Sequence, residues 1–188
     1  MSIDLYLVRH GETAWTRSGR HTGRTDLPLL PEGEAQAGRL GRHLAGIPFA
    51  AVFSSDLRRS LRTAELAGFP TPSPMPLLRE FDYGDYEGLT SEEIWATRPG
   101  WQIYEDGCPG GETPAQVYQR ALAFLRHLEG LEGPVLAFSH GHFSRALAVA
   151  WTDLGIAAAA RLALDTASLS VLREGGRGRV IQLWNLVP

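Results

Sequence analysis

The chain has 188 residues, of which 44% are apolar and 21% charged, and its formal net charge is −3. This composition predicts one globular domain over residues 1–188 and excludes a disordered or fibrous chain. All 18 Lys and Arg positions are arginines. The absence of lysine excludes Schiff-base enzymes, pyridoxal enzymes and P-loop nucleotide hydrolases, because each of them needs a lysine.

Charge, cysteine content and hydropathy also restrict the partners and the compartment. Because the net charge is negative and the arginines are dispersed among acids, we expect no nucleic-acid partner. Cys108 is the only cysteine, which rules out an intrachain disulfide. The sequence contains no signal-peptide pattern and no apolar run near the ~20 residues of a membrane span. We therefore expect a cytoplasmic protein with no membrane partner, and a homodimer stays open beside a monomer.

The first part of the chain predicts two strands separated by a helix. Residues 3–8 form a β-type apolar run that ends at the polar residue Arg9. A long loop is expected before Pro31, which opens a helix. Residues 50–53 make the next buried strand. The predicted helix buries Ala37, Leu40 and Leu44.

Capping residues predict three further helices. Asp56 is expected to be the N-cap of one of them, whose inward side carries Leu57, Leu61 and Ala64. Residues 70–76 form a proline-rich connection. Thr90 and Thr113 each begin a capping box, and the helix after Thr90 must end before Pro99. The inward stripe of the helix after Thr113 is expected to be Tyr118, Ala121, Leu122, Leu125 and Leu128.

The last part of the chain predicts a strand, a helix and a hairpin. Residues 135–139 form an apolar strand that ends at His140, and residues 168–173 and 179–186 form a β-hairpin. Strands that alternate with helices predict a three-layer α/β/α fold with a mostly parallel central sheet, to which the hairpin adds. The inward side chains of the helix after His140 are expected to be Phe143, Ala146, Leu147, Ala150 and Leu154.

Polar residues follow three of the predicted strands. Arg9 and His10 follow the first, residues 54–59 follow the second, and His140 follows the strand at 135–139. Ligands of such sheets bind beyond the carboxyl ends of the strands, so these groups are expected in one crevice. Two imidazoles and two arginines there suit phosphoryl transfer through a phosphohistidine, and the residues alone leave open which imidazole attacks.

Short motifs occur along the chain in the order of a known family. They are RHGET at 9–13, HTG at 21–23, SDLRRS at 55–60, LREFDYG at 78–84, PGGET at 109–113 and SHGH at 139–142. This pattern resembles the histidine phosphatase superfamily, also called phosphoglycerate mutase-like, over residues 9 to about 145. The resemblance implies a metal-independent enzyme without a cofactor.

The resemblance also implies roles for individual residues. His10 would be the nucleophile that becomes phosphorylated, and Arg9, Arg59 and His140 would hold the phosphate. Glu80 matches the acid that protonates the leaving-group oxygen and later deprotonates the attacking water. The residues expected to contact the substrate are His21, Thr22, Gly23, Tyr83, Trp101 and Gly141.

Other polar positions are expected to have simpler roles. Position 16 is Thr16, where the mutases of the family have an asparagine. His142 could suggest a metal pair with His140, but a third ligand at suitable spacing is missing, so we expect it at the rim of the site or at a helix cap. Cys108 is expected to be a small packed residue, and His43 a packing residue away from the site.

The leaving-group side should separate a phosphatase from a mutase. Between Phe81 and Glu112 the chain has one base, Arg98, against eight acids. We expect this acidic rim to disfavour phosphoglycerate and to favour hydrolysis of a small, sugar-type phosphate ester. The segment from Trp101 to Gly111, together with residues 83–88 and 139–145, further resembles a branch of broad-specificity acid phosphatases and sedoheptulose-bisphosphatase-type enzymes. The aromatic side chains Trp101 and Tyr104 would either stack on a polyol or anchor a lid loop. A phosphoglycerate mutase and a non-catalytic phosphate sensor are the alternatives.

Overall fold

The computed structural model describes residues 3–176 and 178–188. Within this part of the chain, six strands form one mixed sheet in the order β3-β2-β4-β1-β5-β6. The strands β1 to β4 run parallel to one another, whereas β5 runs antiparallel to β1 and to β6. The bounds are Asp4–Arg9 for β1, Ala51–Ser54 for β2, Ser73–Pro74 for β3, Val135–Ser139 for β4, Leu169–Gly175 for β5 and Gly178–Leu186 for β6. This confirms the predicted sheet and its C-terminal hairpin.

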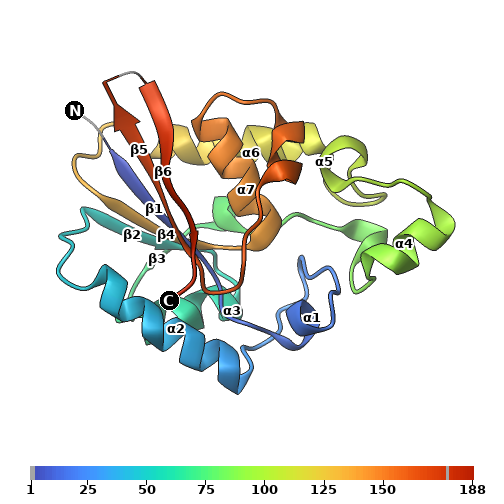
Figure 1. The fold of residues 1–188 in the computed structure, drawn as a ribbon, viewed down its shortest axis with the longest axis horizontal. Helices are drawn as coiled ribbons and strands as arrows, with labels where there is room; N and C mark the ends of the chain where they lie inside the picture. The colour runs from blue at the N-terminus through green and yellow to red at the C-terminus, as the bar shows by residue number, and fades with distance from the viewer. Residues whose placement is uncertain (1–2, 177) are drawn as a thin grey trace.

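Helices cover both faces of the sheet, with α2 and α3 on one face and α6 and α7 on the other (Figure 1). The α-helices are α1 Ala14–Arg17, α2 Pro31–Leu44, α3 Arg58–Leu66, α4 Ser91–Thr97, α5 Ile103–Asp106, α6 Pro114–His127 and α7 Gly141–Trp151. The 3₁₀ turns are η1 Pro76–Leu78, η2 Gly84–Tyr86 and η3 Ile156–Arg161. None of the described helices is long and apolar enough to cross a membrane.

Alternation along the central strands divides the core into two layers. Leu5 and Leu7 of β1 are buried against the α6 and α7 layer, whereas Val8 is buried against α2 and α3. On β4, Val135 faces the first layer and Phe138 the second. Successive side chains of a strand point to opposite faces, so a strand buried on both sides reads as a continuous apolar run.

The capping boxes at Thr90 and Thr113 are confirmed, and α4 ends before Pro99 as predicted. The cap at Asp56 is wrong. Helix α3 begins at Arg58 without a side-chain cap on the preceding residue, and the Asp56 carboxylate instead binds the Arg79 guanidinium. The Arg58 N–H donates to Asp26 Oδ1 at 2.8 Å, so an acid from another loop satisfies the helix end.

Three predicted inward faces need correction. Helix α3 buries a mostly polar side that includes Arg59, Ser60 and Thr63, because this side faces the ends of the strands; Leu57 and Leu61 are only half-buried. Helix α7 ends at Trp151, so Leu154 lies beyond it and is 50% exposed. On α6, Val117 and Phe124 are fully buried, whereas Tyr118 and Leu122 are half-buried.

The backbone ladder brings the loops after three parallel strands together. Arg9 pairs with Ser139 at the ends of β1 and β4. The His10 N–H donates to the Ser139 carbonyl at 3.0 Å, and the Ser55 N–H donates to the Phe138 carbonyl at 2.9 Å. The residues that follow β1, β2 and β4 therefore start side by side, as predicted.

Candidate active site

A cavity of about 170 Å³ lies beyond the carboxyl ends of β1 and β4. Seven of the predicted site residues line it, namely Arg9, His10, His21, Thr22, Glu80, Tyr83 and Gly141. The other lining residues are Thr16, Gly19, Arg20, His142 and Arg145. The remaining predicted residues Arg59, His140, Gly23 and Trp101 are outside this lining set.

His10 is buried at the floor of this cavity with one tautomer fixed. Its Nδ1 lies 2.7 Å from the Gly11 carbonyl oxygen, which can only accept, so Nδ1 carries the proton. The lone pair is therefore on Nε2. Burial and the charges of Arg59 and Arg9 lower the pKa of His10 well below its ordinary value. The ring is thus held as a neutral imidazole, the form that can act as a nucleophile.

His140 lies beside His10, with the ring centroids 5.0 Å apart. Its Nδ1 accepts from Arg59 Nε at 3.1 Å, because a guanidinium can only donate. The proton is therefore on Nε2, which donates to Ser55 Oγ at 2.8 Å. Burial and the Arg59 charge lower the pKa of His140 well below its ordinary value. The imidazole of His140 is thereby fixed in the tautomer opposite to that of His10.

The Arg59 guanidinium is fully buried behind the cavity. Besides its bond to His140, it donates from Nη1 to the Thr25 carbonyl at 2.9 Å. Its Nη2 donates to the Thr22 carbonyl at 3.1 Å and to the Gly23 carbonyl at 2.9 Å. The side chain predicted to bind phosphate thus binds the loop at 22–25 and the second histidine in this structure.

Arg9 lies next to His10 with part of its donor capacity unused. Its Nη1 donates to the Leu164 carbonyl at 2.5 Å. Its Nε is buried and has no hydrogen-bond partner among the described residues. A Cβ at Gly141 would approach Arg9 Nε to 3.2 Å, so glycine leaves space above the guanidinium. An anionic oxygen in the cavity would satisfy this buried donor.

Glu80 stands on the cavity wall with its carboxylate on the N-terminus of α7. Its Oε1 accepts from the N–H groups of Phe81 at 2.9 Å and Phe143 at 2.8 Å. Its Oε2 accepts from the His142 N–H at 3.0 Å. The donors on α7 belong to the first turn, where backbone N–H groups lack helical partners. The carboxylate is thus in a fixed position on the wall of the cavity that contains His10.

An aromatic group forms another part of the wall. The Tyr83 hydroxyl lies 2.5 Å from His142 Nδ1, and the His21 ring stacks on Tyr83 with centroids 4.8 Å apart. Burial lowers the pKa of His21 to about 4 and raises that of Tyr83 well above its usual range. Trp101 packs behind His21, and its indole N–H donates to the Gly107 carbonyl at 2.8 Å. The structure therefore places Trp101 as an anchor of its segment and not in the lining of the cavity.

The loop of Thr22 and Gly23 is bound to an acid. Gly23 is one of the residues expected to contact the substrate. In the structure its N–H lies 3.0 Å from both carboxylate oxygens of Glu87. The Thr25 N–H donates to Glu87 Oε1 at 3.0 Å. The Thr22 hydroxyl donates to the Arg20 carbonyl at 3.2 Å. Glu87 thus accepts from the N–H groups of this loop while Arg59 binds its carbonyls.

The acidic rim expected from residues 81–112 does not line the cavity. In the described part of the chain, the only carboxylate in the lining is that of Glu80. Several acids of the segment form ion pairs instead, namely Asp82 with Arg24 at 2.7 Å, Glu93 with Arg20 at 3.0 Å, Asp106 with Arg98 at 2.6 Å and Glu112 with Arg120 at 2.7 Å. Sequence reasoning missed the lining arginines Arg20 and Arg145. Arg145 lies one helical turn after Gly141, and that spacing is a signal that could have found it.

No group of three or more His, Cys, Asp or Glu side chains in the described residues could hold a metal ion. His140 and His142 each use Nδ1 in a bond within the protein. Cys108 is buried, and burial raises the pKa of its thiol to about 12, which agrees with a packing role. His43 is exposed on α2.

The chain is similar to known proteins over most of its length. The model of the histidine phosphatase superfamily (branch 1) matches residues 5–187. The chain is 43% identical over 173 residues to an acid phosphatase of Mycobacterium tuberculosis, covering 89% of this chain and 84% of the relative. It is 35% identical over 183 residues to the sedoheptulose 1,7-bisphosphatase of Saccharomyces cerevisiae, covering 80% and 68%.

Solved structures share the fold over nearly the whole chain. A Mycobacterium tuberculosis protein superposes with a TM-score of 0.94 at 41% identity, covering 98% of this chain and 97% of the other. The mycobacterial glucosyl-3-phosphoglycerate phosphatase in complex with VO3 superposes with a TM-score of 0.87 at 30% identity, covering 97% and 98%. The names of these relatives support a phosphatase, and the chain belongs to the histidine phosphatase superfamily.

Proposed function

We propose that the chain is a metal-independent phosphomonoesterase that hydrolyses small, sugar-type phosphate esters through a phosphohistidine on His10. The tautomer of His10 carries the proposal, because the bond from Nδ1 to Gly11 leaves the lone pair on Nε2. The unpartnered Nε of Arg9 and the carboxylate of Glu80 share the same cavity. A nucleophile, an anion donor and a proton carrier are the groups that this reaction needs.

The reaction runs in two steps. In the first, His10 Nε2 attacks phosphorus, the bond from phosphorus to the ester oxygen breaks, and Glu80 gives a proton to the leaving oxygen. In the second, Glu80 takes a proton from water, the water oxygen attacks phosphorus, and the bond to Nε2 breaks. Arg9 donates to the phosphoryl oxygens, while Arg59 adds positive charge and fixes the tautomer of His140.

A phosphoglycerate mutase is the second candidate. Arg145 on the cavity wall could bind a carboxylate, and the acids of residues 81–112 do not line the described cavity, so the argument against a mutase from an acidic rim does not hold. A relative named probable phosphoglycerate mutase GpmB, from Salmonella choleraesuis, is 33% identical over 180 residues. The acid phosphatase relative is more similar, at 43% identity, which favours hydrolysis.

The test is to trap the phosphoenzyme. After alkaline quenching of a reaction with labelled substrate, wild type should carry acid-labile, base-stable phosphate, and His10→Ala should carry none. Removing the nucleophile should lower kcat for p-nitrophenyl phosphate at least ~10⁴-fold. His43→Ala, in the exposed part of α2, is the matched control and should behave as wild type. Full turnover by His10→Ala would overturn the mechanism.

A second measurement separates the two candidates. Wild type is supplied with each monophosphoglycerate, and both phosphate release and conversion to the other isomer are followed. Release of phosphate faster than isomer conversion supports the phosphatase. Conversion faster than release assigns the chain to the mutases instead.

A further inference from the structure

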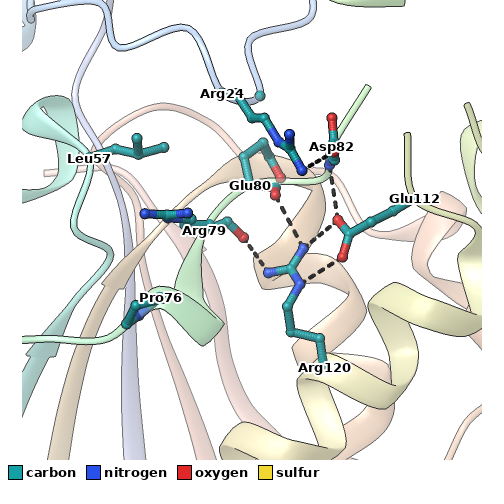
Figure 2. Close-up of a pocket in the computed structure, with 9 residues that line it drawn as sticks. Arg24, Leu57, Pro76, Arg79, Glu80, Asp82, Glu112 and Arg120 are labelled. Atoms are coloured by element: carbon teal, nitrogen blue, oxygen red, sulfur yellow. Dashed lines mark hydrogen bonds and ion pairs between the residues drawn. The ribbon is translucent and has the colours of Figure 1, made fainter. Parts of the chain in front are cut away.

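The PGGET motif at 109–113 takes no part in the two reaction steps, but its acidic residue forms an ion pair close to Glu80. Its acid, Glu112, lies with Arg120 of α6 in a second cavity of about 540 Å³. Figure 2 shows the two side chains facing each other beneath the segment that carries Glu80. Glu80 borders both this cavity and the catalytic one. The pair thus lies next to the proposed proton carrier, outside the lining of the catalytic cavity.

Arg120 uses all five of its N–H donors, and three of them bind one short segment. Its Nη1 donates to the carbonyls of Leu77 at 3.0 Å and Arg79 at 2.6 Å, and its Nη2 donates to the Glu80 carbonyl at 3.1 Å. The other two donors bind Glu112, from Nε at 2.9 Å and from Nη2 at 2.7 Å. A planar guanidinium with every donor occupied has one orientation, so it fixes the backbone that leads to Glu80.

Glu112 fixes the backbone on the other side of Glu80. Its Oε2 accepts from the Asp82 N–H at 2.9 Å, and its own N–H donates to the Asp82 carbonyl at 2.9 Å. A Cβ at Gly111 would lie 2.2 Å from the Asp82 carbonyl oxygen, so the glycine of the motif permits this close approach. The ion pair therefore binds the chain both before and after Glu80.

Arg120 also contacts the helix that holds the Glu80 carboxylate. Its Cζ lies 4.4 Å from the ring centroid of Phe143, a cation–π contact. The Phe143 N–H is one of the donors to Glu80 Oε1, at 2.8 Å. The backbone of Glu80 and the helix end that receives its carboxylate are thus both packed on the same guanidinium.

We propose that Glu112 and Arg120 are positioning residues for Glu80 in both steps of the reaction. This inference rests on the proposed function, in which Glu80 first donates and then accepts a proton. The side chains of Arg120 and Glu112 are 15% and 21% exposed, so the pair is largely shielded from water. A displacement of about 1 Å at a reacting group can cost ~10²-fold in rate, so fixing Glu80 from behind matters for catalysis.

The experiment compares two esters that differ in their need for an acid. p-Nitrophenolate leaves without a proton, whereas the alkoxide of glycerol 3-phosphate needs one. Relative to wild type, Glu112→Gln and Arg120→Lys should lose ~10- to 100-fold more kcat/KM on glycerol 3-phosphate than on p-nitrophenyl phosphate, and Glu80→Gln, which removes the acid itself, should lose activity in the same direction. Arg173→Gln, which breaks an ion pair with Asp4 on the sheet, is the control and should change neither value.

The fraction of phosphoenzyme gives a readout that mere loss of folded protein does not reproduce. If Glu80 is displaced, water attack slows, so p-nitrophenyl phosphate should give a burst of product near one per active site and a raised steady-state level of phosphohistidine. A variant that is only destabilised gives a smaller burst, because fewer sites are active. If Arg120→Lys does not fold, Glu112→Gln carries the test alone.

The outcomes separate this inference from the proposed function. Equal losses on both esters, with a phosphoenzyme level no higher than that of wild type, overturn the positioning role and leave the phosphohistidine mechanism standing. A wild type that never forms phosphohistidine overturns both. A leaving-group effect together with raised phosphoenzyme establishes the positioning role.

Discussion

The floor and the wall of the catalytic cavity are built from different kinds of contact. The floor comprises His10, which follows β1 and lines the cavity, and the residues behind it, His140 after β4 and Arg59 of α3; the register of the sheet sets the distance between the two histidines. The wall is continued by loops that surround the cavity without all lining it, and side chains join these loops; Glu87, for example, accepts from the N–H groups of Gly23 and Thr25. Backbone pairing thus fixes the nucleophile, whereas single carboxylates fix the segments around it.

The two regions also differ in burial. Arg59 in the floor is fully buried, while the ion pair of Arg24 and Asp82, in the surrounding loops and outside the lining of the catalytic cavity, is 81% and 17% exposed in its side chains. Polar contacts gain strength where water is excluded, and a buried group without its partner is costly. Changes in the floor should therefore affect chemistry and stability together, whereas changes in the loops of the wall, apart from Glu80, should affect substrate binding more than the chemical step.

Arg59→Ala should reduce stability more than any single substitution in the wall. It removes the donors to His140 Nδ1 and to the carbonyls of Thr22, Gly23 and Thr25. Leaving a buried network without one partner costs about 3–5 kcal/mol, and the lost positive charge should lower kcat/KM at least ~10²-fold. Urea denaturation and turnover of p-nitrophenyl phosphate measure both effects.

The neighbouring side chain supplies the control for this change. Arg58 is exposed on the same helix, and Arg58→Ala should stay close to wild type in both measurements. Arg59→Lys keeps the charge but not the forked donors, so it should recover little of the stability and kcat/KM that Arg59→Ala loses. A free energy of unfolding for Arg59→Ala equal to that of Arg58→Ala would contradict the claim that the buried contacts of Arg59 stabilise the protein.

Acid should destabilise the protein through the histidines of the cavity. Burial lowers the pKa values of His10, His21, His140 and His142, so the unfolded chain binds more protons below pH 6.5 than the folded one. The stability that their neutral forms contribute is present above that pH and decreases as the pH falls, by up to ~1.4 kcal/mol per pH unit for each group. Urea denaturation from pH 7 to pH 4 measures the slope.

His21 gives this prediction a defined window. Its folded-state pKa is about 4, so its contribution should be lost between pH 6.5 and that value. His21→Gln should therefore flatten the dependence on pH, whereas His43→Gln, at an exposed position, should leave it unchanged. Identical slopes for the two variants would show that the cavity does not keep His21 neutral.

The floor could be predicted from the sequence because local patterns of apolar and polar residues indicate where the strands end. Apolar runs that end in polar motifs mark the ends of β1 and β4, and parallel strands bring those ends together. His10 and His140 followed from that rule. The cap at Asp56 failed because a partner 23 residues further along, Arg79, competes for the carboxylate. A local cap rule contains no information about such a partner.

The wall could not be predicted in the same way. A count of acids between 81 and 112 does not show which are paired, and Glu112 and Asp82 bind arginines that stand outside that segment. Trp101 was expected at the substrate because aromatic faces suit polyols, but its indole N–H has a backbone partner behind the site. Contacts between loops depend on tertiary packing, which periodicity and capping rules do not encode.

The smallest expected effect separates two acids of the wall. Glu87 accepts from the N–H groups of Gly23 and Thr25 at 3.0 Å, so Glu87→Gln should loosen the loop at 22–25, whose residue Thr22 lines the cavity. We expect KM for p-nitrophenyl phosphate to rise up to ~10-fold with little change in kcat, because weaker binding of substrate and transition state alike raises KM alone. Arg24→Ala breaks the ion pair with Asp82, in which the arginine side chain is 81% exposed, so it should cost less than about 1 kcal/mol and leave KM near that of wild type. If Glu87→Gln instead lowers kcat with KM unchanged, the loop takes part in the chemical step, and the division between a chemical floor and a binding wall fails at this position.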